Sequence, residues 1–268
     1  MPAETTAPAS AAAPSVLPRT PSFRLDGRRA LVTGAGRGIG AAAAAALAQA
    51  GAAVTLAARS AQELRRVAAA ISADGGAATV LPLDVTDSAA VSHALAAAGP
   101  FDILVHSAGT NRPALLTEAP DEDIDAVLGL NVRSALLVTR EVARGLIAAG
   151  RPGSLILVSS QMGHVGGPKR SVYCASKHAL EGMCKALAWE FGGHGIRVNT
   201  ICPTFIETAM TAPMLADPAF RGFVESKIAL GRVGRLEEVM GAVVFLASEA
   251  SSLVTGSALM LDGGWTAA

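Results

Sequence analysis

Short apolar runs alternate with longer, helix-forming segments along most of this chain. The apolar runs show no alternation with polar residues and lie at 30–33, 53–57, 79–83, 103–105, 155–158, 196–201 and 258–261. Runs of this kind are typical of strands that are covered on both faces in a parallel sheet. The segments between them predict helices at 38–50, from 60 to the glycines at 75–76, and at 87–98, 121–149, 171–191 and 236–247.

The order of these elements predicts a single doubly wound α/β domain of the Rossmann type at residues 23–268. Its sheet is expected to be mostly parallel and seven-stranded, with helices on both faces. Residues 1–22 are rich in Ala, Pro, Ser and Thr, which predicts a flexible tail. Residues 206–232 form an excursion after the sixth strand. Ligands of a doubly wound sheet bind beyond the carboxyl ends of its strands, so we expect the site there.

Composition narrows the function classes. Hydrophobic residues make up 51% of the 268 residues, charged residues make up 16%, and the formal net charge is zero. This balance gives no reason to expect a nucleic-acid partner, and no apolar stretch is long enough to span a membrane. We therefore expect a small-molecule substrate.

The cysteines, the histidines and the N-terminal segment bear on compartment and metals. Residues 1–22 lack the basic and apolar regions of a secretory signal. The three cysteines form no C-x-x-C pair, so we expect a reducing, cytoplasmic location. The five histidines are not spaced as a metal pair, which predicts no catalytic metal.

A glycine-rich loop follows the first strand. The segment Thr33-Gly-Ala-Gly-Arg-Gly-Ile-Gly40 lies directly before the first helix. Glycines allow a tight turn and a close approach of the backbone to a pyrophosphate, which binds at the helix N-terminus. An ordinary glycine-rich turn is the alternative, but the position between the first strand and its helix favours dinucleotide binding.

The end of the second strand indicates which dinucleotide is bound. NAD sites usually carry an acidic residue here, against the ribose 2′-hydroxyl, whereas this chain reads Ala58-Arg59-Ser60. Arg59 can bind a 2′-phosphate, and Arg37 in the glycine loop is a second cation for it. We therefore predict that NADP(H) is preferred and that NAD(H) is possible. The alternative is that both arginines only face solvent.

Ser160, Tyr173 and Lys177 form a candidate catalytic group. Tyr173 and Lys177 lie four residues apart in a predicted helix and share one face, and Tyr173 is the only tyrosine in the chain. An ammonium ion near a phenol favours the phenolate, so we expect a lowered tyrosine pKa. The phenol can then exchange a proton with a substrate oxygen, to which Ser160 can hydrogen-bond. The spacing alone is a weak signal, because a half-buried tyrosine beside a solvated lysine is common.

Taken together, these segments resemble the short-chain dehydrogenase/reductase family over residues 23–268. Three positions depart from the family pattern: His106-Ser107 replaces an Asn-Asn pair, and Thr204 replaces a glycine. The sequence therefore does not show whether this chain makes the contacts that the asparagine side chains make in the family. The motifs that carry the resemblance are Thr33 to Gly40, Asp84-Val85, Ala108-Gly109, Asn131, Ser160, Tyr173, Lys177, Pro203, Ile206 and Thr208.

The resemblance implies a catalytic tetrad of Asn131, Ser160, Tyr173 and Lys177. Tyr173 would act as acid and base, and Ser160 would orient the substrate oxygen. Lys177 would lower the tyrosine pKa and hold the nicotinamide ribose, and Asn131 would support a water beside Lys177. Hydride would pass between the nicotinamide C4 and the substrate carbon. The implied cofactor contacts are Gly34, Arg37, Gly38, Ile39, Gly40, Arg59, Asp84, Val85, Ala108, Gly109, Tyr173, Lys177, Pro203, Ile206 and Thr208.

The substrate is expected between the segment after Ser160, the excursion and the loop after Gly109. Arg112 in that loop can meet a carboxylate. The segments 236–239 and 262–265 are similar to those of sugar-acid and polyol dehydrogenases of the family, such as gluconate 5-dehydrogenase. We therefore expect an NADP-linked enzyme that interconverts a secondary alcohol and a ketone on a small polar or sugar-like substrate. The residues expected to bind the substrate are Ser160, Gln161, His164 and Tyr173.

Two other functions stay open. A 3-oxoacyl-carrier-protein reductase would need a basic docking patch, for which Lys169 and Arg170 are candidates. A catalytically silent nucleotide sensor or scaffold would be marked by loss of tetrad residues, and all four are present.

Family likeness also implies a homotetramer or homodimer that assembles through the helices at 121–149 and 171–191 and the last strand. Ala135, Thr139 and Ala143 form a small-residue stripe on the first of these helices, which can admit a partner helix or pack on the protein's own sheet.

Overall fold

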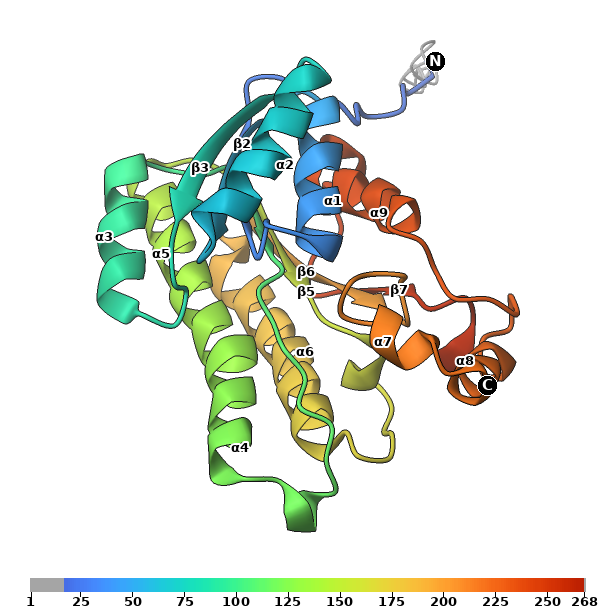
Figure 1. The fold of residues 1–268 in the computed structure, drawn as a ribbon. Helices are drawn as coiled ribbons and strands as arrows, with labels where there is room; N and C mark the ends of the chain where they lie inside the picture. The colour runs from blue at the N-terminus through green and yellow to red at the C-terminus, as the bar shows by residue number, and fades with distance from the viewer. Residues whose placement is uncertain (1–16, 268) are drawn as a thin grey trace, which may run out of the picture.

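A parallel sheet of seven strands forms the centre of the molecule, in the computed structural model that describes residues 17–267 (Figure 1). The strand order is β3-β2-β1-β4-β5-β6-β7, and every neighbouring pair is parallel. The predicted doubly wound sheet is confirmed, and it is parallel throughout. The strands are β1 (Arg29–Thr33), β2 (Ala53–Ala58), β3 (Ala77–Pro82), β4 (Ile103–His106), β5 (Gly153–Val158), β6 (Ile196–Pro203) and β7 (Ala258–Leu261).

Helices cover both faces of the sheet, and each layer buries an apolar core of its own (Figure 1). The alanines of the first helix allow the last one to pack closely against it. Leu56 lies in the first core and Leu155 in the second. One layer contains α1 (Gly38–Gln49), α2 (Ala61–Ala73) and α9 (Glu237–Ala247), and the other contains α3 (Ser88–Ala98), α5 (Ser134–Ala148) and α6 (Ser171–Gly192).

The long helical stretch predicted at 121–149 is confirmed, and it contains a π-helical turn that the sequence did not predict. It divides into α4 (Asp121–Leu128) and α5, which are joined by a π-helical turn at Gly129–Arg133. The apolar periodicity runs through this turn, so the sequence pattern shows no break. A π turn often marks a functional site, and this one contains Asn131, which is only 1% exposed.

Residues 206–232 leave the sheet and fold into two short helices, α7 (Ala212–Leu215) and α8 (Pro218–Ser226). In Figure 1 they project beside β7. They enclose a small separate core, which consists of Leu215, Val224, Ile228 and Val233 packed against Phe205, Phe220 and Trp265. This segment is called the side wall below.

Residues 1–16 of the predicted tail lie outside the described residues, and residues 17–22 are exposed and carry no helix or strand. The chain joins the fold at Leu25, which is buried, and at Phe23, whose ring lies 6.5 Å from that of Phe245. Within residues 17–267, no helix combines the length and the apolarity needed to cross a bilayer.

Candidate active site

The carboxyl ends of β1, β4, β5 and β6 are close together in the sheet, and each leads into a predicted site segment. The glycine loop follows β1, Ala108-Gly109 follows β4, Ser160 follows β5, and Pro203 ends β6. Because all four strands are parallel, these segments meet along one edge, which is where doubly wound sheets bind ligands.

Two glycines of the glycine loop leave no room for a side chain. Gly34 and Gly38 adopt φ angles of 65° and 56°, in the left-handed region that favours glycine. A Cβ at Gly34 would lie 2.8 Å from the Ala108 nitrogen, and one at Gly40 would overlap the Gly34 carbonyl. Within the described chain, no side chain caps α1 and its first turn has no acidic residue. Its free N–H groups therefore fit a pyrophosphate.

Arg59 directly follows β2, and Asp84 follows the neighbouring strand β3. The Asp84 carboxyl has a lowered pKa, chiefly because Thr86 donates hydrogen bonds to it and also because the Arg59 charge is near. Among residues 17–267, Arg59 forms no ion pair. Arg37, by contrast, lies 3.7 Å from Glu63. Arg59 is therefore the better candidate for a 2′-phosphate.

The segment after β6 closes against the glycine loop. Ile206 is buried and pairs with Gly234. A Cβ added to Gly38 would lie 3.7 Å from the Thr208 methyl group. The start of the side wall thus faces the glycine loop.

Tyr173 and Lys177 come together on one face of α6. The Lys177 ammonium lies 5.6 Å from the centre of the Tyr173 ring and donates a 2.9 Å hydrogen bond to the Val158 carbonyl. Lys177 is 5% exposed. Burial lowers its pKa to about 8, although Cys202 and Glu181 oppose this shift.

The pKa of Tyr173 shifts in the direction opposite to the expected one. Burial raises it, whereas the Ser160 hydroxyl and the Arg170 charge lower it. The Lys177 ammonium donates its hydrogen bond to the Val158 carbonyl and not to the phenol. The expectation of a lysine-lowered tyrosine pKa is therefore wrong for this arrangement.

Ser160 begins the turn at Gln161–Gly163. Its oxygen accepts a hydrogen bond from the Met162 N–H at 3.1 Å, and its hydroxyl faces the Gln161 amide oxygen at 3.1 Å and the Pro203 carbonyl at 3.4 Å. Gln161 is buried behind Ser160. The Gln161 side chain thus positions the Ser160 hydroxyl.

Asn131 is held from two sides. Its Oδ1 accepts the Thr110 N–H at 2.8 Å, and its Nδ2 donates to the Thr110 carbonyl and the Ser176 hydroxyl, both at 2.9 Å. Gly109 lies between the asparagine and the lysine, since a Cβ added there would be 3.3 Å from Asn131 Oδ1 and 3.8 Å from Lys177 Nζ. All four tetrad residues therefore lie at the same edge of the sheet.

His106, which replaces an asparagine of the family pattern, connects the end of β1 to the π turn. Its Nδ1 lies 3.0 Å from the Thr33 hydroxyl, and its Nε2 lies 3.1 Å from the Ser134 hydroxyl, which itself donates to the Leu130 carbonyl. Burial lowers the His106 pKa to about 3, so the ring is neutral. Sequence reasoning noticed the departure but not this function.

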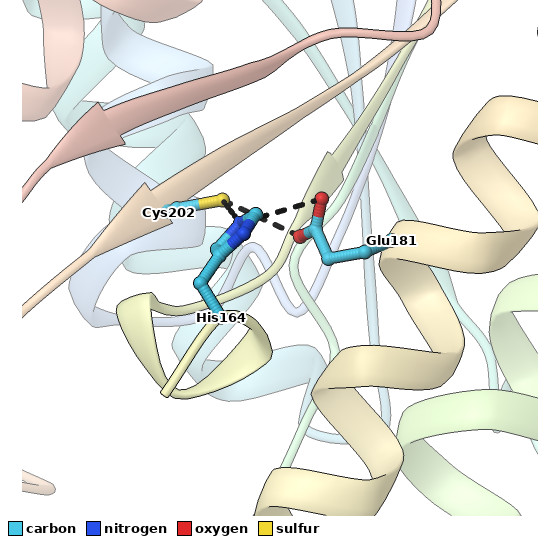
Figure 2. Close-up of side chains that lie close together, drawn as sticks. All are labelled: His164, Glu181 and Cys202. Atoms are coloured by element: carbon cyan, nitrogen blue, oxygen red, sulfur yellow. Dashed lines mark hydrogen bonds and ion pairs between the residues drawn. The ribbon is translucent and has the colours of Figure 1, made fainter. Parts of the chain in front are cut away.

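His164, Glu181 and Cys202 form a cluster at the ends of β6 and the Gln161–Gly163 turn and on α6 (Figure 2). The His164 Nε2 lies 3.5 Å from the Cys202 sulfur and 3.6 Å from a Glu181 oxygen, and the thiol lies 3.4 Å from the other carboxylate oxygen. Burial raises the pKa of Cys202 to about 12, so the thiol is protonated. The His164 ring is thus directed at this cluster, although the sequence suggested a substrate contact. Glu181 was missed by sequence reasoning, although its place four residues after Lys177 could have indicated it.

Comparison with known proteins establishes the family. A family model described as enoyl-(acyl carrier protein) reductase matches residues 34–266. The chain belongs to the short-chain dehydrogenase/reductase family. The resemblance drawn from its motifs is confirmed, and the protein is an oxidoreductase.

Relatives of this short-chain dehydrogenase/reductase align over nearly its whole length. Gluconate 5-dehydrogenase of Gluconobacter oxydans is 40% identical, with 91% of this chain and 96% of that protein covered. L-Xylulose reductase of Bos taurus is also 40% identical, with 91% and 99% covered. The crystal structure of a gluconate 5-dehydrogenase from Burkholderia cenocepacia J2315 in complex with NADP and tartrate is 37% identical, covers 92% of this chain and 98% of its own, and has a TM-score of 0.88.

Proposed function

We propose that this short-chain dehydrogenase/reductase uses NADP(H) to interconvert a secondary alcohol and a ketone on a small polar, sugar-like substrate. The observation that carries the proposal is the convergence of the tetrad residues beside a glycine loop that fits a pyrophosphate. The names of the relatives, gluconate 5-dehydrogenase and L-xylulose reductase, support the substrate class.

The cofactor preference rests on Arg59. It directly follows β2 and forms no ion pair within residues 17–267, so its guanidinium is free to bind a 2′-phosphate. Related crystal structures contain NADP. NAD(H) is proposed as a second, weaker cofactor.

In this mechanism the cofactor supplies or accepts the hydride, and the protein moves the proton. The Tyr173 phenol donates its proton to the ketone oxygen during reduction and takes it back from the alcohol during oxidation. Its raised pKa keeps the phenol protonated at neutral pH, which suits ketone reduction. The Ser160 hydroxyl hydrogen-bonds the same substrate oxygen and stabilises the phenolate that remains.

Lys177 and Asn131 support this proton transfer. With a pKa of about 8, Lys177 is charged at pH 7 and can hold the nicotinamide ribose. Asn131 fixes the backbone at Thr110 beside it. We propose that a water near Asn131 connects Lys177 to solvent.

The two alternative functions gain little support. Arg170, half of the docking patch suggested for an acyl carrier protein, is half-buried and lies against Met214, so it is poorly placed for surface docking. A silent scaffold is disfavoured because all four residues of the proposed tetrad are present in the sequence.

The deciding experiment measures turnover of a ketose, an aldonate and an acyl thioester with NADPH or NADP, followed by absorbance at the nicotinamide band. Tyr173→Phe should reduce turnover at least about a hundredfold, because it removes the proton donor. NADPH affinity should be retained. Turnover close to that of the wild type in this variant would refute the mechanism.

We also propose that the enzyme forms a homotetramer or homodimer in the cytoplasm. The three cysteines are free thiols, which fits a reducing compartment.

A further inference from the structure

Arg170 differs from the other cationic groups around the tetrad. The Arg112 guanidinium, to which the sequence assigned a possible carboxylate contact, lies 3.6 Å from Asp123. The His164 ring faces Glu181 (Figure 2). Within residues 17–267, Arg170 forms no ion pair.

The Arg170 guanidinium is partly removed from water. Its Nη2 lies 3.4 Å from the sulfur of Met214 in α7, and its Nη1 is buried without a hydrogen-bond partner in the described chain. Burial lowers the pKa of this guanidinium. A desolvated charge without a counter-ion is unfavourable, so a ligand that supplies the negative charge would stabilise this arrangement.

The position of Arg170 places this charge beside the reaction. Arg170 directly precedes α6, three residues before Tyr173, and its charge lowers the pKa of the Tyr173 phenol. Its contact with Met214 connects it to the side wall. Arg170 therefore lies between the helix that carries Tyr173 and the side wall.

The turn that carries Arg170 is strained. Lys169 has a φ of 60°, and within residues 17–267 it is the only residue other than glycine with a positive φ. This conformation is unfavourable for a long side chain, and such strain is concentrated at functional sites. The strained turn holds Arg170 at the N-terminus of α6.

We propose that Arg170 forms an anion subsite that binds the carboxylate of a hydroxy-acid or keto-acid substrate beside Tyr173. The inference rests on the proposed function and selects sugar acids over neutral polyols within it. A carboxylate is preferred to a phosphate, because one guanidinium with one free Nη1 matches a single negative charge, whereas a phosphate carries nearly two. The neighbouring Lys169 is exposed and does not add a second buried cation.

The test compares D-gluconate with D-gluconamide, which has the same skeleton and no charge, as substrates with NADP. Wild-type kcat/KM should favour gluconate at least tenfold. Arg170→Gln should abolish that preference by raising the KM for gluconate more than the KM for gluconamide. Lys169→Gln is the matched control, since it removes the adjacent exposed charge and should keep the preference.

Three results would overturn the inference. The first is an equal wild-type kcat/KM for gluconate and gluconamide, and the second is an equal fall in kcat/KM for both compounds in Arg170→Gln. The third is a tenfold loss of NADPH affinity in that variant. The last result would assign Arg170 to the cofactor site. Thermal melts of both variants would show that they are folded.

A binding measurement separates this inference from the proposed function. Calorimetry titrates gluconate into the Tyr173→Phe enzyme saturated with NADP, with and without Arg170→Gln. Gluconate binding that needs Arg170 supports the subsite even if no turnover is found. Turnover of neutral ketoses without Arg170-dependent gluconate binding would retain the proposed function and refute the subsite.

Discussion

His106 illustrates how one buried side chain can connect two parts of an active site. Its ring lies between the Thr33 hydroxyl at the end of β1 and the Ser134 hydroxyl after the π turn. The sequence showed only that an asparagine of the family pattern was replaced. The role depends on partners 73 and 28 residues away, so it required the tertiary structure.

Because the His106 ring is buried in its neutral form, we expect the protein to lose stability in mild acid. Its folded pKa of about 3 is below the unfolded value of about 6.5, so the unfolded chain binds more protons between these values. The free energy of unfolding should therefore fall as pH drops below about 6.5, by up to about 1.4 kcal/mol per unit. Urea unfolding at pH 7 and pH 5 measures this fall in the free energy of unfolding.

His106→Asn, which restores the asparagine of the family pattern, is the matched variant for this prediction. It lacks the titrating ring, so its loss between pH 7 and pH 5 should be smaller by about 2 kcal/mol. Equal losses in both proteins would show that the histidine ring is not kept neutral.

The preference for NADPH over NADH should depend on the single side chain of Arg59. Arg59→Asp should reduce kcat/KM for NADPH at least about tenfold, because a charge-assisted bond to the 2′-phosphate is replaced by repulsion. The preference should shift toward NADH, whose ribose hydroxyl the new carboxylate can bind. Arg37→Gln should have a smaller effect, since Arg37 already faces Glu63. An unchanged ratio of Michaelis constants for the two cofactors would contradict this assignment.

At the scale of elements, helix α6 and the π turn carry three of the four residues of the proposed tetrad. Tyr173, Lys177 and Glu181 follow at intervals of four residues and so share one helix face. The π turn presents Asn131 to this face, and Ser176 accepts its amide. The spacing on α6 could be predicted from sequence, whereas the π turn could not, because it keeps the apolar pattern of a continuous helix.

Ser176→Ala tests whether this contact positions Asn131. The hydroxyl joins Asn131 Nδ2 to the Tyr173 carbonyl, so its loss should reduce the free energy of unfolding by about 1 kcal/mol. It should also lower kcat several-fold, with little change in KM. Ser171→Ala, at the exposed start of the same helix, should change neither quantity. A fall in stability without any fall in kcat would leave Ser176 with a structural role alone.

At the scale of the whole molecule, a groove between α5 and α6 presents apolar side chains at the surface. Leu136 is 48% exposed and Ile147 38% exposed, and both line this groove with Leu187 and Phe191. Ala135, Thr139 and Ala143 are buried within the chain, which favours the alternative that this stripe packs on the protein's own core.

Leu136→Glu should weaken self-association, because it places a charge in the apolar groove through which we propose that copies assemble. Light scattering should show a smaller mass than for the wild type at equal concentration. Leu116→Glu, at an exposed leucine outside this groove, should keep the wild-type mass. A monomeric wild type, or an unchanged mass for Leu136→Glu, would remove the groove as the interface.

The sequence by itself determined the parallel sheet, the glycine loop and the tyrosine–lysine spacing, since each follows from local periodicity or short motifs. Tertiary structure alone decided the π turn around Asn131, the neutral His106 and the direction of the Tyr173 pKa. It also decided which of the arginines near the site form ion pairs: in the described chain Arg37 and Arg112 do, whereas Arg59 and Arg170 do not. These properties depend on burial and on groups distant in the chain, which local patterns do not contain.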